Sequence, residues 1–302
     1  MGNLLPILCL ISGGKTSGFM AIYLRLLYPN RRILFAFGNT GREREETLIF
    51  LKMIDEVWNL GIVWIEAVIN PEKGKGTGYK IVNFDTASRD GEPFEDAIKK
   101  YGLPSKLFRH CTRELKEVPI HKYASDYFER EAFFDWLRSN YTSIKPYPTH
   151  EDYKLTTLYK TFKDQYKSDY LSAVGIRSDE KHRLSKKANH IFPLADMNFT
   201  KTFINDWWNA QPFNLELKES EGNCDFCFLK SKRKRVNLLK NGLNVDWWNN
   251  MEIKYGNERQ PIFDVRNGES IEDLIKMASE EMNQLSFFDL DDIDFDCFCK
   301  AN

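Results

Sequence analysis

The chain has no long hydrophobic segment. Nowhere in its 302 residues is there a run close to the about 20 apolar residues that a transmembrane helix requires. We therefore expect no membrane partner, and the N-terminus has no basic region followed by a small-residue cleavage site, so the sequence predicts a cytoplasmic protein. A net charge of −1 excludes a general electrostatic attraction to nucleic acid and leaves only local patches for binding a polyanion.

Histidine and cysteine are also scarce. The five histidines form no metal-spaced pair, so we assign none of them to catalysis or to a metal site. There are six cysteines, and because disulfides are rare in the cytoplasm, they favour a metal site or catalysis. Cys9 is the exception, since it lies inside an apolar run and is predicted to be a buried hydrophobic residue.

Short apolar runs alternate with helical patterns along most of the chain. The runs are residues 4–11, 33–37, 62–69, 170–176 and 190–194. Runs without polar alternation are typical of strands that are buried on both faces of a parallel sheet. We predict a doubly wound α/β fold with a mostly parallel five-stranded sheet and a ligand crevice at the C-terminal ends of its strands. Ser12, Asn39 and Ile176 would emerge at that edge.

The other segments complete a two-domain hypothesis. A nucleotide-binding α/β domain is predicted over residues 1–211, with a helical insertion at about 120–168. The glycine- and lysine-rich stretch 70–91 is predicted to be a long surface loop, and it is a candidate active-site flap. Residues 212–302 are predicted to form an irregular, cysteine-bearing C-terminal region that packs on the first domain and ends in an acidic tail.

A glycine turn follows the first apolar run and precedes a helical pattern. It consists of Ser12, Gly13, Gly14, Lys15, Thr16 and Ser17. Glycines let the backbone approach oxyanions closely, and the N-terminus of the helix offers N–H groups that have no partner within the helix. The turn therefore predicts phosphate binding, with a simple strand-to-helix connection as the structural alternative.

Further segments occur in the order found in one known family. They are Phe37-Gly38-Asn39-Thr40-Gly41, then Cys111 with Lys116 and Pro119, then Gly175-Ile176-Arg177, then Phe192-Pro193-Leu194, and finally Cys224-Asp225-Phe226-Cys227. With the glycine turn, this order resembles the phosphoadenosine phosphosulfate (PAPS) reductase-like family of the PP-loop ATP pyrophosphatases. The resemblance covers about residues 4–227, and Asn39 stands where the family has an acid.

The resemblance implies a fold, a reaction and a set of residues. The fold is the PP-loop type, and the reaction is adenylylation of a substrate by ATP with Mg²⁺, followed by sulfur transfer. Implied nucleotide-binding residues are Ser12, Gly13, Gly14, Lys15, Thr16, Ser17, Asn39, Gly41 and Arg177. Lys15, Lys116 and Arg177 are the implied catalytic residues, and Arg177 is the expected phosphate clamp because a guanidinium can bind phosphate through two parallel hydrogen bonds.

The cysteines extend the resemblance to members that contain an iron–sulfur cluster. Such clusters are commonly held by four thiolates. Cys111, Cys224 and Cys227 match the family pattern, but Thr112 stands where a second cysteine is usual. The tail could supply the fourth thiolate, and we favour Cys299 over Cys297. A four-cysteine zinc site and unrelated reduced thiols are the alternatives, because zinc accepts the same ligands.

Two other functions stay open at this stage. The chain could be a PAPS or adenylylsulfate reductase that uses a tail cysteine, although Lys15 favours a triphosphate ligand. It could also be a non-catalytic zinc- and nucleic-acid-binding module, since Lys230, Lys232, Arg233, Lys234 and Arg235 form a basic run. The sulfur donor, a protein or sulfide, is not identified, nor is the acceptor, for which nucleic acid is one candidate. The oligomeric state is also left open.

Overall fold

A computed structural model describes residues 4–106, 108–141, 153–164, 166, 169–218, 221–263 and 268–281. The first half contains β1 (Ile7–Ile11), α1 (Lys15–Leu27), β2 (Ile33–Asn39), α2 (Glu45–Trp58), β3 (Val63–Val68), β4 (Gly78–Val82), α3 (Glu92–Tyr101), α4 (His110–Thr112), the π-helical turn η1 (Arg113–Glu117) and α5 (Val118–Asn140). The second half contains the short helix η2 (Tyr153–Leu155), α6 (Thr157–Lys163), β5 (Leu171–Ala173), η3 (Ser178–Arg183), β6 (His190–Ile191), α7 (Pro193–Asp196), α8 (Lys201–Asn209), α9 (Lys232–Lys240), α10 (Asp246–Tyr255) and α11 (Ile271–Glu281).

The sheet has six strands in the order β4-β3-β2-β1-β5-β6. All its neighbouring pairs are parallel except β3 and β4, which are antiparallel. The α/β prediction is confirmed at this level, but the prediction of five strands is wrong. The sixth strand, β4, lies within the segment predicted to be a surface loop. Its sequence is mostly polar or exposed because it forms the edge of the sheet, so it lacks the apolar run that marks the inner strands.

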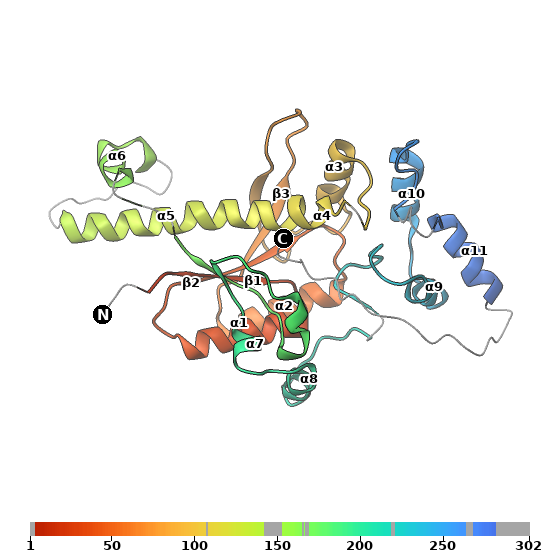
Figure 1. Ribbon diagram of the computed structural model, residues 1–302, viewed down its shortest axis with the longest axis horizontal. Helices are drawn as coiled ribbons and strands as arrows, with labels where there is room; N and C mark the ends of the chain where they lie inside the picture. Colours follow the sequence, from red (N-terminus) through yellow and green to blue (C-terminus); the bar gives the residue numbers. More distant parts are fainter. Residues whose placement is uncertain are drawn as a thin grey trace.

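Helices cover both faces of the sheet (Figure 1). Residues alternate between faces along a strand, and in β1 Ile7 and Cys9 pack with α1, α2 and α8, whereas Leu8 packs with α5. The first half of α5 thus covers the sheet, through Ile120, Tyr123, Ala124 and Phe128. Its second half packs on α6 in a separate cluster that contains Phe133 and Phe162. The proposed insertion at 120–168 therefore includes a helix that covers part of the sheet core.

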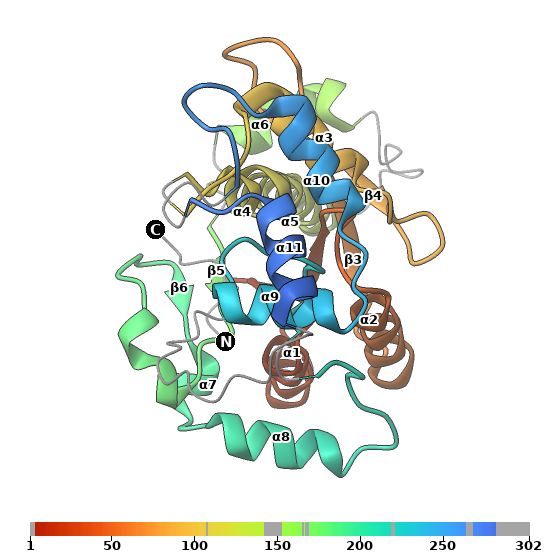
Figure 2. The same ribbon diagram turned by 90° about the vertical axis from the view of Figure 1, so that its right-hand side faces the viewer.

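The C-terminal region is more regular than predicted. Three helices, α9, α10 and α11, follow the CxxC segment, so the expectation of an irregular region is wrong for this part of the chain. They pack with α3 and the end of β3 in a second core that includes Phe226, Trp248 and Phe263. Each of these helices has only 9 to 11 residues, so the sequence contains only a short pattern for each. They gather beyond the C-terminal ends of the parallel strands (Figures 1 and 2).

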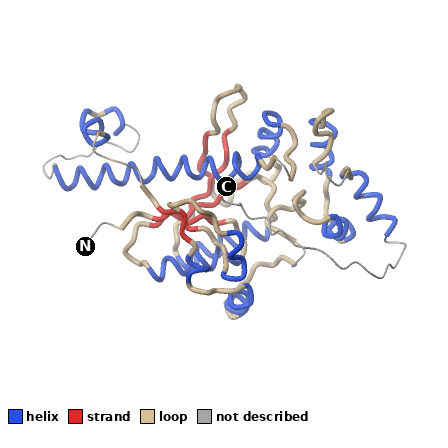
Figure 3. Tube along the Cα trace, in the orientation of Figure 1, coloured by secondary structure: helices blue, strands red, loops and turns tan. Residues whose placement is uncertain are grey.

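The tube in Figure 3 shows how this arrangement places strands in the middle and helices on the outside. None of the helices in the described parts of the chain is both long enough and apolar enough to cross a membrane. Cys9 is fully buried in β1, as the sequence predicts.

Candidate functional site

The predicted phosphate loop connects β1 to α1 in a left-handed turn. Gly13 has a φ of +84°, which a residue with a side chain rarely adopts. Gly14 is the N-cap of α1 and, being a glycine, has no side chain that could cap the helix. The first N–H groups of a helix have no partner inside it, so no N-cap side chain accepts a hydrogen bond from those of α1.

Ser17 closes the turn. Its hydroxyl donates to the carbonyl of Gly14 at 3.0 Å and lies 3.1 Å from the amide nitrogen of Ser12 and 3.0 Å from the Ser12 hydroxyl. The Ser17 hydroxyl therefore bonds other residues of the loop and stabilises the conformation of the turn.

The order of the strands brings a second segment to this loop. Chain connections run outward from β1 toward β2 on one side and return to β5 on the other, and ligands of open α/β sheets bind at such a reversal. Gly175, just after β5, approaches the loop so closely that an added Cβ would lie 3.5 Å from the Cα of Ser17. The predicted meeting of the loops after β1 and β5 is thus observed.

Arg177 lies at the centre of this meeting point. Its Nη1 donates to the Thr16 hydroxyl at 3.1 Å, and its guanidinium also pairs with Asp179 at 3.1 Å and with Glu180 at 3.4 Å. The residue is buried. The guanidinium thus ties the loop after β5 to α1, while its predicted role as a phosphate clamp stays a prediction.

Lys15 is the first residue of α1 and is partly exposed. Its carbonyl accepts a hydrogen bond of 2.8 Å from the indole N–H of Trp208, which anchors the start of the helix to the core. Partial burial lowers the pKa of the Lys15 ammonium, and the nearby charge of Glu216 opposes that shift.

Asn39, at the end of β2, is fully buried. Its Nδ2 donates to Glu66 Oε1 at 2.6 Å and to the carbonyl of Ser88 at 2.9 Å. Glu66 is also fully buried and pairs with Lys80 of β4 at 3.1 Å. A carboxylate therefore lies directly beside the position where the family has an acid. Our sequence reasoning missed Glu66, although an acid inside an apolar strand was an available signal.

Gly41 follows in the same loop with a φ of +79°. A Cβ there would lie 2.8 Å from the Ser88 hydroxyl and 3.0 Å from the Cα of Gly91. The segment predicted to be a flap is thus packed against this loop, and Ser88 also donates its backbone N–H to Glu66 at 2.6 Å. Glu66 is a buried carboxylate that needs these donors, and the role of the segment as an active-site flap stays a prediction.

Glu43 is a second residue that the sequence reasoning missed. One of its carboxylate oxygens accepts from the backbone N–H and the hydroxyl of Thr40, both at 2.8 Å. The other oxygen pairs with the ammonium of Lys116 at 3.2 Å, and the carboxylate is fully buried. Glu43 thus holds the predicted catalytic Lys116 against the loop that follows β2.

Three predicted metal ligands line one small cavity. Cys111, Cys224 and Cys227 surround a volume of about 40 Å³, together with Thr40, Lys116, Trp248 and other side chains. Cys111 lies more than 100 residues before the Cys224–Cys227 pair in sequence, and the fold brings it to them.

The donor chemistry of this thiol cavity fits a soft metal centre, because thiolates are ligands for iron–sulfur clusters and zinc. Among the described residues, however, no group of three or more His, Cys, Asp or Glu side chains is arranged to hold a metal ion. The favoured fourth ligand, Cys299, and its neighbour Cys297 lie outside the described residues. The set of metal ligands therefore stays a prediction.

The side chains of the basic run point to different environments. Lys230 and Arg235 are buried, whereas Lys232 and Arg233 are exposed. Lys230 donates to the carbonyl of Cys224 at 3.1 Å, and Lys232 pairs with Glu269 at 2.9 Å. The five residues therefore do not form one continuous surface for a nucleic-acid backbone.

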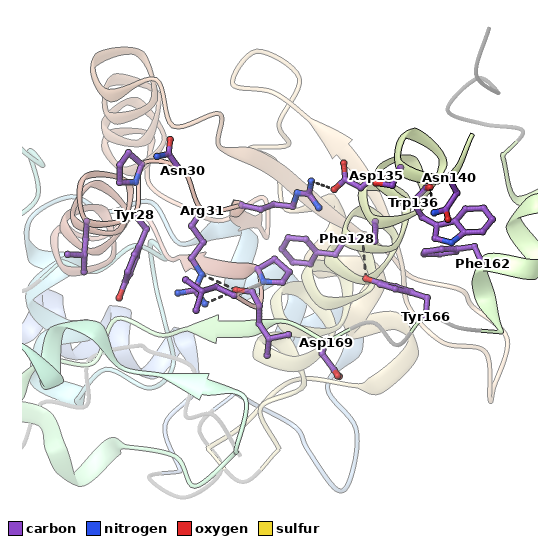
Figure 4. Close-up of a pocket in the computed structure, with 18 residues that line it drawn as sticks. Tyr28, Asn30, Arg31, Phe128, Asp135, Trp136, Asn140, Phe162, Tyr166 and Asp169 are labelled. Atoms are coloured by element: carbon purple, nitrogen blue, oxygen red, sulfur yellow. Dashed lines mark hydrogen bonds and ion pairs between the residues drawn. The ribbon is translucent and has the colours of Figure 1, made fainter. Parts of the chain in front are cut away.

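A larger cavity, of about 970 Å³, lies at the opposite ends of the strands. Figure 4 shows Tyr28 and Arg31 on one side of it and Trp136 and Phe162 on the other. Arg31 donates to the carbonyl of Leu5, and Arg32 pairs with Asp135 at 2.6 Å. None of the predicted site residues lines this cavity. The cavity lies at the start of β1, whereas the phosphate loop follows the end of that strand.

The fold and this edge of the sheet define the protein as an α/β protein with a mostly parallel sheet and a glycine turn at the N-terminus of its first helix. It is similar to the uncharacterized nin region protein ORF290 of Escherichia phage lambda, at 30% identity over 230 residues that make up 74% of this chain and 66% of the phage protein. It is also similar to the uncharacterized protein MJ0066 of Methanocaldococcus jannaschii, at 25% identity over 57% of this chain and 28% of that protein. No protein-family profile and no solved structure matches the chain.

The geometry of Gly13 yields the first testable prediction. A Cβ at this position would lie 2.3 Å from Thr47 Cγ2, and Thr47 is fully buried. We expect Gly13→Ala to reduce the free energy of unfolding by about 2–5 kcal/mol, because it adds a left-handed backbone cost to an overpacking cost. Urea unfolding measures the change.

The matched control is Gly61→Ala. Gly61 has a φ of +69°, but a Cβ there would have no atom within 4 Å. This variant should lose only the backbone contribution, about 1–2 kcal/mol. Equal losses in the two variants would show that the contact with Thr47 does not constrain the loop.

Proposed function

We propose that the chain is a PP-loop ATP pyrophosphatase that adenylylates a substrate for sulfur transfer and holds a 4Fe–4S cluster at the thiol cavity. One observation supports this proposal above the others. The glycine turn at the start of α1 and the cavity lined by three cysteines lie at the same edge of the sheet, and Asn223, next to Cys224 in the chain, bonds the carbonyl of Ser12 in the turn.

The phosphate loop suits a leaving pyrophosphate. A substrate oxygen would attack the α-phosphorus of ATP, the bond between the α-phosphorus and its bridging oxygen to the β-phosphate would break, and pyrophosphate would leave with Mg²⁺. Donors at the N-terminus of α1, together with Lys15, would stabilise the charge that develops on the pyrophosphate. A sulfur nucleophile would then displace AMP from the adenylylated substrate.

Lys116 lines the thiol cavity and pairs with a residue of the loop that follows β2. That residue, Glu43, fixes its ammonium at 3.2 Å. From this position Lys116 would stabilise negative charge on the nucleotide or on the attacking sulfur. Cys111, Cys224 and Cys227 would hold the cluster with a fourth thiolate from the tail, and such a cluster would supply a Lewis acid or an electron carrier.

Binding of ATP to the wild-type chain and to Lys15→Ala tests the nucleotide part of the proposal. The variant should bind ATP about 10–100-fold more weakly, because it loses a hydrogen bond from a charged group. Isothermal titration calorimetry measures both affinities. Lys52→Ala is the control, since Lys52 is exposed on α2 and should leave ATP binding unchanged.

The same titrations separate the two nucleotide reactions. Equal ATP affinity in the wild type and in Lys15→Ala would contradict the role of Lys15. Much tighter binding of PAPS than of ATP by the wild type would favour a sulfonucleotide reductase.

The pH dependence of ATP binding should follow Lys15. Burial lowers the pKa of its ammonium from the usual 10.5, so the charge is lost at a lower pH than in an exposed lysine. We expect the ATP affinity of the wild type to fall as the pH rises through that lowered pKa. Lys15→Ala should not show this alkaline loss, and a loss of the same size in both proteins would assign it to another group.

The cluster proposal predicts brown protein after anaerobic purification, with iron and acid-labile sulfide in equal amounts. Cys224→Ser should lose the visible absorption and most of the iron, because it removes one thiolate ligand. Cys9→Ala is the control, since Cys9 is buried in β1 and is not among the residues that line the cavity. Colourless wild-type protein with stoichiometric zinc would replace the cluster by a zinc site.

A further inference from the structure

The segment 223–225, which carries the first cysteine of the CxxC pair, is paired with the loop after β2. The backbone N–H of Arg44 donates to the carbonyl of Asn223 at 2.9 Å, and that of Asp225 donates to the carbonyl of Arg42 at 3.0 Å. Glu43 and Cys224 thus face each other in an antiparallel bridge. The backbone of Cys224 is held in place by a loop that also belongs to the predicted nucleotide site.

The side chain of Asn223 reaches the other loop of the site. Its Nδ2 donates to the carbonyl of Ser12 at 2.7 Å. Ser12 is the first residue of the phosphate loop, and its backbone N–H and its hydroxyl both contact Ser17. Asn223 therefore bonds the loop after β1 through its side chain and the loop after β2 through its backbone.

A second connection runs in parallel. Thr40 and Lys116 line the thiol cavity, and both bond the buried carboxylate of Glu43. Glu43 also faces Cys224 across the bridge, so a displacement of the segment 223–225 would disturb the buried ion pair between Glu43 and Lys116. Through Asn223 the same displacement would shift Ser12 of the phosphate loop. Networks of packed and hydrogen-bonded groups of this kind can carry coupling between two sites.

We propose that Asn223 is a positioning residue for the phosphate loop and that it couples the nucleotide site to the Cys224 thiol. A nucleotide that fixes the phosphate loop would thereby also fix the segment 223–225. Conversely, a change at Cys224 would alter the position of Ser12. This inference rests on the proposed function, because it takes ATP as the ligand of the loop.

The test measures how fast iodoacetamide alkylates Cys224 in the full-length chain, freed of thiol-bound metal beforehand and assayed with Mg²⁺ so that ATP binds as in the proposed reaction. Mass spectrometry of the peptide that contains Cys224 gives the rate with and without saturating ATP. Coupling free energies between sites typically correspond to factors of about 5–150. We therefore expect ATP to slow alkylation of the wild type at least about fivefold.

Asn223→Ala should remove this protection, so that ATP changes the rate by less than about twofold. Asn214→Ala is the matched control, because Asn214 donates to the exposed Asn209 at 2.9 Å and makes no such bond to the phosphate loop. It should keep the wild-type protection. A merely structural role of Asn223 would change the rates with and without ATP equally and leave their ratio unaltered.

Asn223→Asp provides a second variant of nearly the same size that lacks the N–H donor, for use if Asn223→Ala does not fold. It too should lose the protection when ATP is raised to saturation. Equal protection in the wild type and in the folded Asn223 variant would overturn the coupling, since ATP would then shield the thiol directly. The absence of any ATP effect in a wild type that binds ATP by calorimetry would also overturn it, whereas a wild type that binds no ATP would overturn the proposed function and the coupling with it.

Discussion

Strand β1 is the element on which the arrangement of the site depends. It pairs in parallel with β2 on one side and with β5 on the other. The chain continues from β1 to β2 on one side and later returns to β5 on the other side of β1. The loops after β1 and β5 therefore lie next to each other at the point where the strand order reverses. Arg177 and Thr16 bridge that point through a hydrogen bond, so a buried guanidinium is bonded to the first turn of α1.

The edge of the sheet is covered by the C-terminal part of the chain and contains several buried charges. Glu43, Glu66 and Arg177 are all buried there, and each has charged or hydrogen-bonding partners. An unpaired buried charge would be costly, so each of these groups is held by its own partners: Glu43 by Thr40 and Lys116, Glu66 by Asn39 and Lys80, and Arg177 by Thr16, Asp179 and Glu180. The result is a rigid polar framework that holds the phosphate loop on one side and the thiol cavity on the other.

Much of the sheet could be predicted because its inner strands are buried on both faces. The runs around β1, β2, β3, β5 and β6 are continuous in the sequence, and they identify the parallel part of the sheet without any tertiary information. Strand β4 could not be found in this way, since all five of its residues are half-buried or exposed and it follows a glycine- and lysine-rich stretch. The helices after the CxxC segment are short, and they are stabilised by packing on one another and, for α10, on α3.

For the candidate site, too, some features could be predicted from the local sequence and others depend on tertiary packing. The glycine turn and its position between a strand and a helix were determined by the sequence alone, because glycine content and a change of hydrophobic period are local properties. The meeting of Cys111 with the CxxC pair, the pairing of Glu43 with Lys116, and the carboxylate of Glu66 beside Asn39 were decided only by the tertiary structure. Each joins groups on separate segments, and the distance between such segments depends on how the whole chain packs, which no local pattern encodes.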